Sequence, residues 1–260
     1  MKSIGTYVYC LVAGMRRPST TRLRSRLDGA GPVRLLALDS AGRGLKKWLV
    51  VSDVPLDRYG EEVINRRLSD LDWVSRAAVA HETVVESFIG AVALVPMKLF
   101  TIFTGDARAT EHVEAERPRI DVAIAKVRGR IELGVRVTLS QPTTKALSRP
   151  RGDGAATGAA YLTAKKAQRD RAAEFASRAR ETVADLYDDL ATIAADAVRR
   201  SASELPVKGG PLLLDAAFLV ARSRERSFRS AVARRAAALA PSGYSVAMTG
   251  PWPPYTFVAE

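Results

Sequence analysis

The feature that most constrains the fold of this 260-residue chain is a long amphipathic segment in its C-terminal half. Between residues 158 and 201, apolar side chains recur at steps of three and four, which predicts one long helix with a single apolar seam. A lone helix with one apolar seam must bury it. We expect packing within the chain, with packing against a partner as the alternative. The seam consists of Ala172, Phe175, Ala179, Val183, Leu186, Leu190, Ile193 and Ala197.

Strands are predicted on both sides of this helix. Residues 127–139 alternate apolar and polar side chains, which is typical of an antiparallel strand. Residues 212–221 and 244–249 predict two more strands, with a helix over residues 222–240 between them. The resulting order β–α–β–α–β is compatible with a ferredoxin-like sandwich, in which helices cover one face of a sheet.

The N-terminal half predicts a second mixture of strands and helices. Residues 4–13, 33–39 and 45–51 favour strands because they are rich in β-branched and aromatic residues or are bounded by turn residues. A helical region follows Pro55, and the helix predicted at residues 73–88 has an apolar stripe at Ala77, Ala80, Val84 and Phe88.

Two prolines shape the segment that follows. Residues 91–104 resemble a strand that Pro96 interrupts, which indicates an edge strand or a bend. Residues 106–126 have helical composition, and Pro118 must kink or divide that helix.

The chain is therefore predicted to be an α+β protein of two domains. The first is an N-terminal α+β domain over residues 1–126. The second covers residues 127–260 and carries the long helix at 158–201. Residues 140–157, which are rich in Pro, Ser, Thr and Gly, are predicted to be a linker or a mobile loop.

The net charge of +12 is concentrated near the N-terminus. Residues 1–50 contain ten Lys and Arg against two acidic residues, and a cluster comprises Arg16, Arg17, Arg22, Arg24 and Arg26. Such an excess could attract phosphates or an acidic protein partner, whereas a solvated, flexible loop is the simpler interpretation. A basic nucleic-acid-binding protein is therefore the alternative function. The lack of a zinc-finger or ribonucleoprotein motif argues against it.

Neither a membrane span nor a secretory signal is predicted. The longest uncharged apolar run, residues 87–97, is well short of the roughly 20 residues that a bilayer requires. The N-terminus alternates like a strand, unlike a secretory signal. The single cysteine, Cys10, excludes an internal disulfide framework, and its apolar neighbours predict an inert buried thiol. We expect a cytoplasmic protein that does not bind membranes.

Motifs typical of catalysis are missing from the sequence. It has no phosphate-binding loop, dinucleotide-binding motif or nucleophile elbow, and its one cysteine and two histidines nearly exclude a metal site. His81 beside Glu82 is conceivable as a general base, although a histidine that packs or hydrogen-bonds on a helix surface is the simpler interpretation. Asp185, Asp188 and Asp189 predict a solvated helix face rather than a cation site. We expect no enzymatic activity and no cofactor.

The most specific motif lies at the C-terminus. Residues 250–258 read Gly-Pro-Trp-Pro-Pro-Tyr-Thr-Phe-Val and follow a predicted strand. They closely resemble the ending of the GvpF/GvpL gas vesicle family. Leu99 and Phe100 depart from the family, which often has Phe-Gly at these positions. Other segments similar to the family, in the same order, are residues 7–10, 72–73, 80–85, 95–103, 129–135, 158–166 and 215–220.

The resemblance implies two α+β domains, of which the second is a modified ferredoxin-like fold that carries the long helix. It also implies contact with the small hydrophobic shell protein of the gas vesicle and with other accessory vesicle proteins. The family brings no catalytic or cofactor residues. The chain is accordingly interpreted as an accessory or minor structural protein that binds the shell protein during gas vesicle assembly.

The proline-rich tail suggests where such binding could occur. Its prolines remove backbone donors and fix φ, so the tail cannot extend a central sheet and must lie across a surface. Aromatic side chains held there would form part of a docking site, completed by the segment around Pro96. The alternative is that the aromatic residues only pin the C-terminus onto the fold. The candidate protein-binding residues are Trp252, Tyr255, Phe257, Pro96, Phe100 and Phe103.

Overall fold

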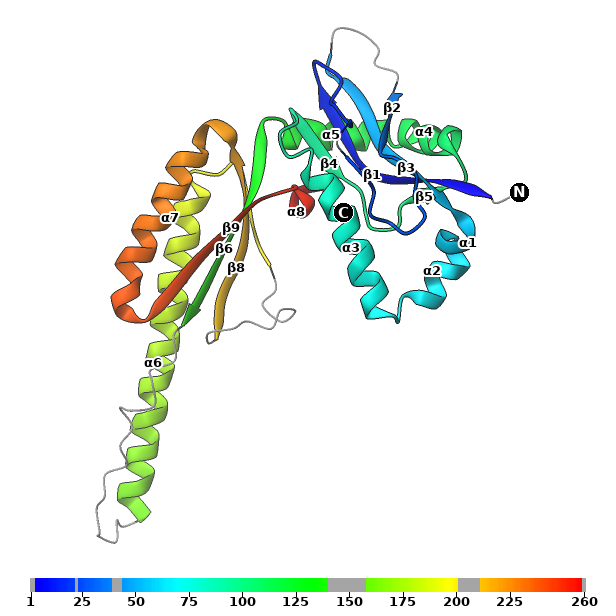
Figure 1. Cartoon of the computed structure of the whole chain (residues 1–260). Helices are drawn as coiled ribbons and strands as arrows, with labels where there is room; N and C mark the ends of the chain where they lie inside the picture. The colour runs from blue at the N-terminus through cyan, green and yellow to red at the C-terminus, as the bar shows by residue number, and fades with distance from the viewer. Residues whose placement is uncertain (1–2, 22, 39–43, 140–157, 201–210, 259–260) are drawn as a thin grey trace. The chain divides into compact units, whose positions relative to one another are not determined.

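A computed structural model describes the chain apart from residues 1–2, 22, 39–43, 140–157, 201–210 and 259–260 (Figure 1). It contains helices and two sheets, which confirms the predicted α+β class. The chain divides into two compact units. The first combines residues 1–132 with residues 251–260, and the second comprises residues 133–250. The C-terminal tail thus belongs to the first unit, whereas the predicted second domain, residues 127–260, included it.

The first unit is built on a five-stranded sheet with the order β2–β3–β1–β4, and β5 also pairs with β1. All of these pairings are antiparallel. Each strand coincides with a predicted one, although the predicted segment at 91–104 becomes two short strands, the first of which ends at Pro96. The strands are β1 Ile4–Gly14, β2 Arg34–Leu38, β3 Lys46–Pro55, β4 Ala93–Pro96 and β5 Ile102–Phe103.

The central strand β1 is buried on both faces, and no side chain in residues 7–13 is more than 1% exposed. Tyr7 and Tyr9 point into one hydrophobic cluster, whereas Val8 and Leu11 point into another. The register with β3 shifts between Val8 and Cys10, so that Tyr9 and Cys10 face the same cluster. Such a bulge re-aims side chains along a strand.

Helices cover both faces of this sheet. The first cluster is completed by α3, and the second by α4 and α5. The carboxylate of Asp70 caps α3 by accepting a hydrogen bond from the Trp73 N–H at 3.0 Å. Pro118 lies in the first turn of α5, as the prediction of a divided helix required. The helices are α1 Leu56–Tyr59, α2 Glu61–Arg67, α3 Leu71–Glu86, α4 Asp106–Ala115 and α5 Arg117–Val127.

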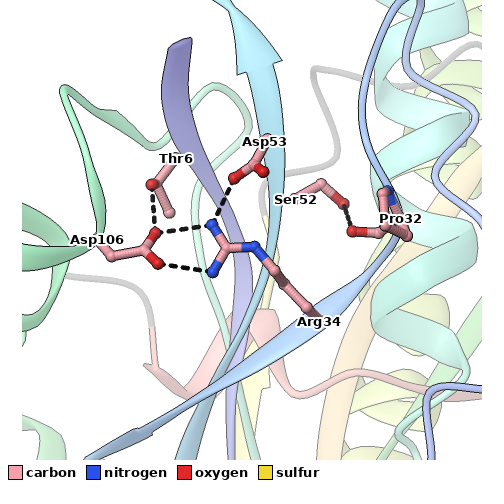
Figure 2. Close-up of polar contacts among 6 residues, drawn as sticks. All are labelled: Thr6, Pro32, Arg34, Ser52, Asp53 and Asp106. Atoms are coloured by element: carbon pink, nitrogen blue, oxygen red, sulfur yellow. Dashed lines mark hydrogen bonds and ion pairs between the residues drawn. The ribbon is translucent and has the colours of Figure 1, made fainter.

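A polar cluster ties the edge of the sheet to the start of α4. Figure 2 shows the Arg34 guanidinium between the carboxylates of Asp53 and Asp106. Arg34 donates to both oxygens of Asp106, at 2.7 and 2.8 Å, and the Thr6 hydroxyl donates to the same carboxylate at 2.6 Å. The bond from Arg34 holds the pKa of Asp106 below its ordinary value of 3.8. Residues from β1, β2, β3 and α4 are thereby joined in one network.

The second unit contains a four-stranded sheet with the order β7–β8–β6–β9. The succession β6–α6–β7–β8–α7–β9 is the one that ferredoxin-like folds use, and it supports that interpretation, which stays a prediction. Figure 1 shows α6 and α7 side by side against this sheet. The elements are β6 Arg130–Leu139, α6 Gly158–Ala191, β7 Asp196–Arg199, β8 Leu212–Ala221, α7 Glu225–Leu239 and β9 Tyr244–Trp252.

The predicted end of the long helix at residue 201 is wrong. Helix α6 ends at Ala191, and β7 follows and pairs antiparallel with β8. The spacing of Ile193 and Ala197 continued the helical seam by coincidence. The backbone of this segment hydrogen-bonds to the buried strand instead, beginning with the Ala195 N–H and the Leu219 carbonyl at 2.8 Å. Tertiary pairing therefore overrides the helical pattern.

The seam of α6 is buried only in its C-terminal part. Ala179, Val183, Leu186 and Leu190 are at most 4% exposed, which confirms packing within the chain for these residues. Phe175, one turn earlier, is 49% exposed. Figure 1 shows that α6 continues beyond the edge of the sheet, where no other element of this unit covers it among the described residues.

The tail prediction also needs one correction. Strand β9 continues through Pro251 to Trp252, one residue beyond the proline at which we expected the chain to leave the sheet. The strand lies at an edge of its sheet, where a residue without a backbone N–H is tolerated. Residues 140–157, the predicted linker or loop, lie outside the described residues.

We expect Asp106→Asn to lower the free energy of unfolding by about 1 kcal/mol near neutral pH, because Arg34 loses a charged partner in a partly exposed network. The folded pKa of Asp106 is depressed, so its contribution is complete above the unfolded pKa and is lost as the pH falls through the folded pKa. Denaturant titrations from neutral to acidic pH measure this. Asp57→Asn, which changes an exposed carboxylate in the first turn of α1, is the control. A difference that persists undiminished into strong acid would contradict the assignment.

Candidate functional site

The chain turns sharply after β9 and forms a short final helix, α8, at Tyr255–Val258. Pro253 and Pro254 are both buried. Their carbonyls accept hydrogen bonds from the N–H groups of Tyr255, at 2.8 Å, and Phe257, at 3.1 Å. Proline fixes φ, so the tail enters this turn with little conformational freedom to lose. The tail is therefore ordered by its own sequence as well as by its contacts.

Two carboxylates of the first unit hold the tail in place. The Tyr255 hydroxyl donates to Glu82 of α3 at 2.8 Å. Thr256 donates its backbone N–H and its hydroxyl to the two oxygens of Glu132, at 3.0 and 2.7 Å. Glu132 is only 3% exposed, so these bonds help to satisfy a carboxylate that water cannot reach freely. Burial raises the pKa of Glu82 and that of Tyr255.

Apolar contacts complete the attachment of the tail. Phe257 is 5% exposed, and the Lys126 ammonium lies 5.5 Å from the centre of its ring. Val258 packs against the cluster that α4 and α5 form with β1. Phe257 thus anchors the tail, and the interpretation that aromatic residues pin the C-terminus is correct for this side chain.

A pocket of about 770 Å³ opens beside the tail, and every residue that lines it belongs to the first unit. Val8 of β1 and Val95 of β4 contribute to its lining. One wall follows β4 and the connection to β5, with Pro96, Met97 and Phe103. A pocket of this size with a mainly apolar lining is typical of a binding site. We call it the tail pocket.

The other walls of the tail pocket come from α5 and the tail itself. Ile120, Val122 and Ala123 line it from α5, and Tyr255 and Phe257 line it from α8. Val122 is 69% exposed, which is unusual for a large apolar side chain beside a pocket. Lys98, Arg119 and Lys126 add positive charge to the lining, and Glu116 adds a negative charge.

Four of the six predicted binding residues meet in this pocket. Pro96, Phe103, Tyr255 and Phe257 all line it, although they are separated by more than 150 residues of sequence. The contribution of α5 was not predicted. Val122 and Ala123 could have been noticed as apolar residues on a short amphipathic helix, but nothing in the sequence indicates which of them faces solvent.

The remaining two predicted residues do not line the tail pocket. Phe100 stacks on Trp73, with ring centres 5.0 Å apart and planes at 8°, and packs against the first cluster. Its φ of 64° is unusual for a bulky residue, and its N–H donates to the Tyr7 hydroxyl at 3.3 Å. Trp252 is 41% exposed at the end of β9.

The predicted general-base candidate, His81, lies in the core rather than on a helix surface. It is 3% exposed, and its Nδ1 atom lies 2.8 Å from the Tyr7 hydroxyl. Burial lowers the pKa of His81 to about 4, so the ring is neutral near pH 7. Cys10 is fully buried, and burial raises the pKa of its thiol well above the ordinary value. Both side chains are therefore packed in the core, where His81 also hydrogen-bonds with Tyr7.

Two of the three aspartates considered as a cation site on α6 pair with arginines. Asp188 lies 3.9 Å from Arg199 of β7, and Asp189 contacts Arg235 of α7. Within the described ranges, no group of three or more potential metal-ligating side chains is found. None of the helices in the described part of the chain is long and apolar enough to cross a membrane.

Comparison with known proteins identifies relatives of the whole chain. A family model described as gas vesicle synthesis protein GvpL/GvpF matches residues 5–259. Gas vesicle protein L of a Streptomyces species is 29% identical over 213 residues, covering 80% of this chain and 78% of that protein. Gas vesicle protein L2 of Halobacterium salinarum is 25% identical over 288 residues, covering 99% of this chain and 92% of that protein.

Solved structures share the fold at lower sequence identity. The crystal structure of the gas vesicle protein GvpF from an Anabaena species superposes with a TM-score of 0.67 at 16% identity, covering 99% of both chains. That of GvpF from Microcystis aeruginosa gives a TM-score of 0.62 at 14% identity, covering 98% of this chain and 99% of that one. The family model spans nearly every residue, including the strands, the long helix and the tail described above. The chain belongs to the GvpL/GvpF family of gas vesicle proteins.

Proposed function

We propose that this protein is a non-enzymatic accessory protein of gas vesicle assembly, and that it captures the small hydrophobic shell protein at the tail pocket. The observation that carries the proposal is the position of the tail. The segment that most closely resembles the family helps to line an apolar pocket, and so does an exposed valine on α5. We also propose that the protein acts in the cytoplasm, in association with gas vesicles and their other accessory proteins.

The physical requirements of assembling a gas vesicle shell support this role. Shell subunits present apolar surface that aggregates before it is built into a wall, so an escort must cover it. The tail pocket offers apolar side chains together with tyrosine and phenylalanine rings. Because prolines and buried hydrogen bonds already order the tail, little conformational entropy remains to be lost on binding.

The chemistry of the pocket favours binding over catalysis. Its lining has one histidine, His112, whose ring lies 5.1 Å from that of Phe103. Glu116 pairs with Arg119 at 2.8 Å. A nucleophile with an adjacent base is not found among the lining residues. The contacts that the pocket offers are mainly van der Waals contacts with an apolar partner.

Val122→Glu should weaken capture of the shell protein by roughly ten-fold or more, because a charge would then lie in an apolar contact. The side chain is 69% exposed, so the fold should tolerate the change. Co-expression with the shell protein followed by affinity capture measures the effect. Val79→Glu is the matched control, since Val79 is 61% exposed on α3 and lies outside the pocket lining. Equal capture by both variants would refute the proposed location.

Trp252→Ala should weaken capture of the shell protein clearly and change the melting temperature little. The reason is that the indole is partly exposed and precedes the first pocket-lining residue of the tail by only three positions. Phe175→Ala, at an exposed aromatic residue of α6, is the control. Capture at several salt concentrations, beside a melting curve, separates the possibilities. Apolar binding should persist at high salt, whereas phosphate-driven binding falls steeply. An unfolded variant, or one that captures normally, would leave Trp252 with a structural role only.

Deletion of the gene should abolish or deform gas vesicles while the shell protein is still expressed. The reason is that an escort acts after synthesis of the shell protein and before its incorporation into the wall. Electron microscopy of the deletion strain, with an immunoblot for the shell protein, measures both quantities, and complementation with the intact gene is the control. Normal vesicles in a strain without a second family member would contradict the proposed function.

A further inference from the structure

The arginine-rich segment near the N-terminus is anchored to the core rather than free. Leu27 is 5% exposed, and Leu23 packs against the same hydrophobic cluster. Between them, the Ser25 hydroxyl oxygen accepts a hydrogen bond from the Tyr9 hydroxyl at 2.7 Å and another from the Leu27 N–H at 3.2 Å. A flexible solvated loop would make no such regular contacts with the core. The sequence-based interpretation of a flexible loop therefore fails for residues 23–27.

This anchoring presents two arginines in a fixed row. Exposure alternates along residues 23–27, with Leu23, Ser25 and Leu27 turned inward and Arg24 and Arg26 exposed. Alternation with a period of two is the pattern of an extended chain, in which alternate side chains lie about 6.6 to 7 Å apart on one side. Arg24 and Arg26 are thus both turned away from the core, two positions apart in the sequence.

The charge of this segment is not neutralised within the described part of the chain. Arg24 and Arg26 make no ion pair there, nor do the exposed Arg16 and Arg17 at the start of the same loop. The acidic residue that follows, Asp28, is engaged by Arg58. Four positive charges in one loop repel one another unless an anion binds between them. The surface is therefore electrostatically prepared for an acidic ligand.

We propose that Arg24 and Arg26 form a docking row for a carboxylate-rich segment of a partner protein, bound in extended conformation. Alternate carboxylates of an extended peptide repeat every 6.6 to 7 Å or so and lie on one side of it, so two of them can each meet one of the two exposed guanidiniums. The planar guanidinium matches a carboxylate in bidentate geometry. The row is separate from the tail pocket in its residues and in its driving force, so it extends the proposed function to a second partner surface.

A protein partner fits this surface better than a nucleic acid does. Proteins that bind single strands combine positive charge with aromatic side chains on which bases stack. Residues 14–31 contain no Phe, Tyr or Trp. Two anchored arginines in a short row also match the length of a peptide motif, whereas binding along a phosphate backbone uses a longer positively charged groove.

The test uses the purified full-length chain and a fluorescein-labelled ten-residue peptide in which Glu and Ser alternate. Fluorescence anisotropy gives the affinity at low salt. The double variant Arg24→Gln/Arg26→Gln should bind about ten-fold more weakly, because two charge-assisted contacts are lost. The matched control is Arg224→Gln/Arg226→Gln, which removes the same charge from two exposed arginines at the same sequence spacing. It should bind within about two-fold of the unchanged chain.

Two further measurements, together with the peptide affinities, decide the outcome. Melting curves should be the same for both double variants and the unchanged chain, since all four side chains are exposed. An equal loss of peptide affinity in both double variants would overturn the proposal, because net charge alone would then explain binding. A labelled 20-nucleotide single strand that binds more tightly than the peptide, and loses affinity only with Arg24→Gln/Arg26→Gln, would also overturn it in favour of a nucleic-acid surface.

Discussion

The double burial of β1 is the constraint on which the first unit depends. A strand with no exposed side chain from residue 7 to residue 13 needs a hydrophobic layer on each face, and α3 supplies one while α4 and α5 supply the other. The layer of α4 and α5 creates the tail pocket, because Val8 of β1 lines it together with α5. On the other face, the Tyr7 hydroxyl lies beside His81 and accepts a bond from the Phe100 N–H. The unusual backbone of Phe100, which costs about 1 kcal/mol or more, is compensated by that bond and by the stacking on Trp73.

Two acidic side chains, one buried and one half-buried, attach the tail to this scaffold, and the attached tail completes the pocket. Glu132 would be costly in the interior if its oxygens lacked donors, and Thr256 supplies two. The energetic coupling runs both ways, because the tail is ordered by the carboxylate and the carboxylate is satisfied by the tail. As a result, the pocket is lined in part by Thr256, which lies 124 positions from Glu132 in the sequence, and by its neighbours in the tail. The two compact units are consequently interleaved in the sequence rather than consecutive.

Local patterns predicted most elements, and long-range contacts account for the differences. Alternation and β-branched composition located β1, β6 and β8, and Pro118 marked the division between α4 and α5. The strand β7 was missed because four residues cannot show a period of their own, and only their pairing with β8 defines them. The family resemblance drew attention to Pro96, Phe103, Tyr255 and Phe257, which meet in the pocket. It could not separate them from Phe100, whose direction depends on a local φ that sequence composition does not reveal.

The two proposed surfaces rest on different physics, and this difference suits a protein that handles an aggregation-prone subunit. Attraction between the arginine row and an acidic segment acts over a Debye length of about 8 to 10 Å, so it raises the rate of encounter more than the final affinity. Contact at the tail pocket acts only when water has been excluded, and it then determines how slowly the partner leaves. An apolar surface that is steered by charge spends less time exposed before it is covered. Separation of the two functions also allows each to be weakened alone, since Arg24 and Arg26 do not line the pocket and Val122 carries no charge.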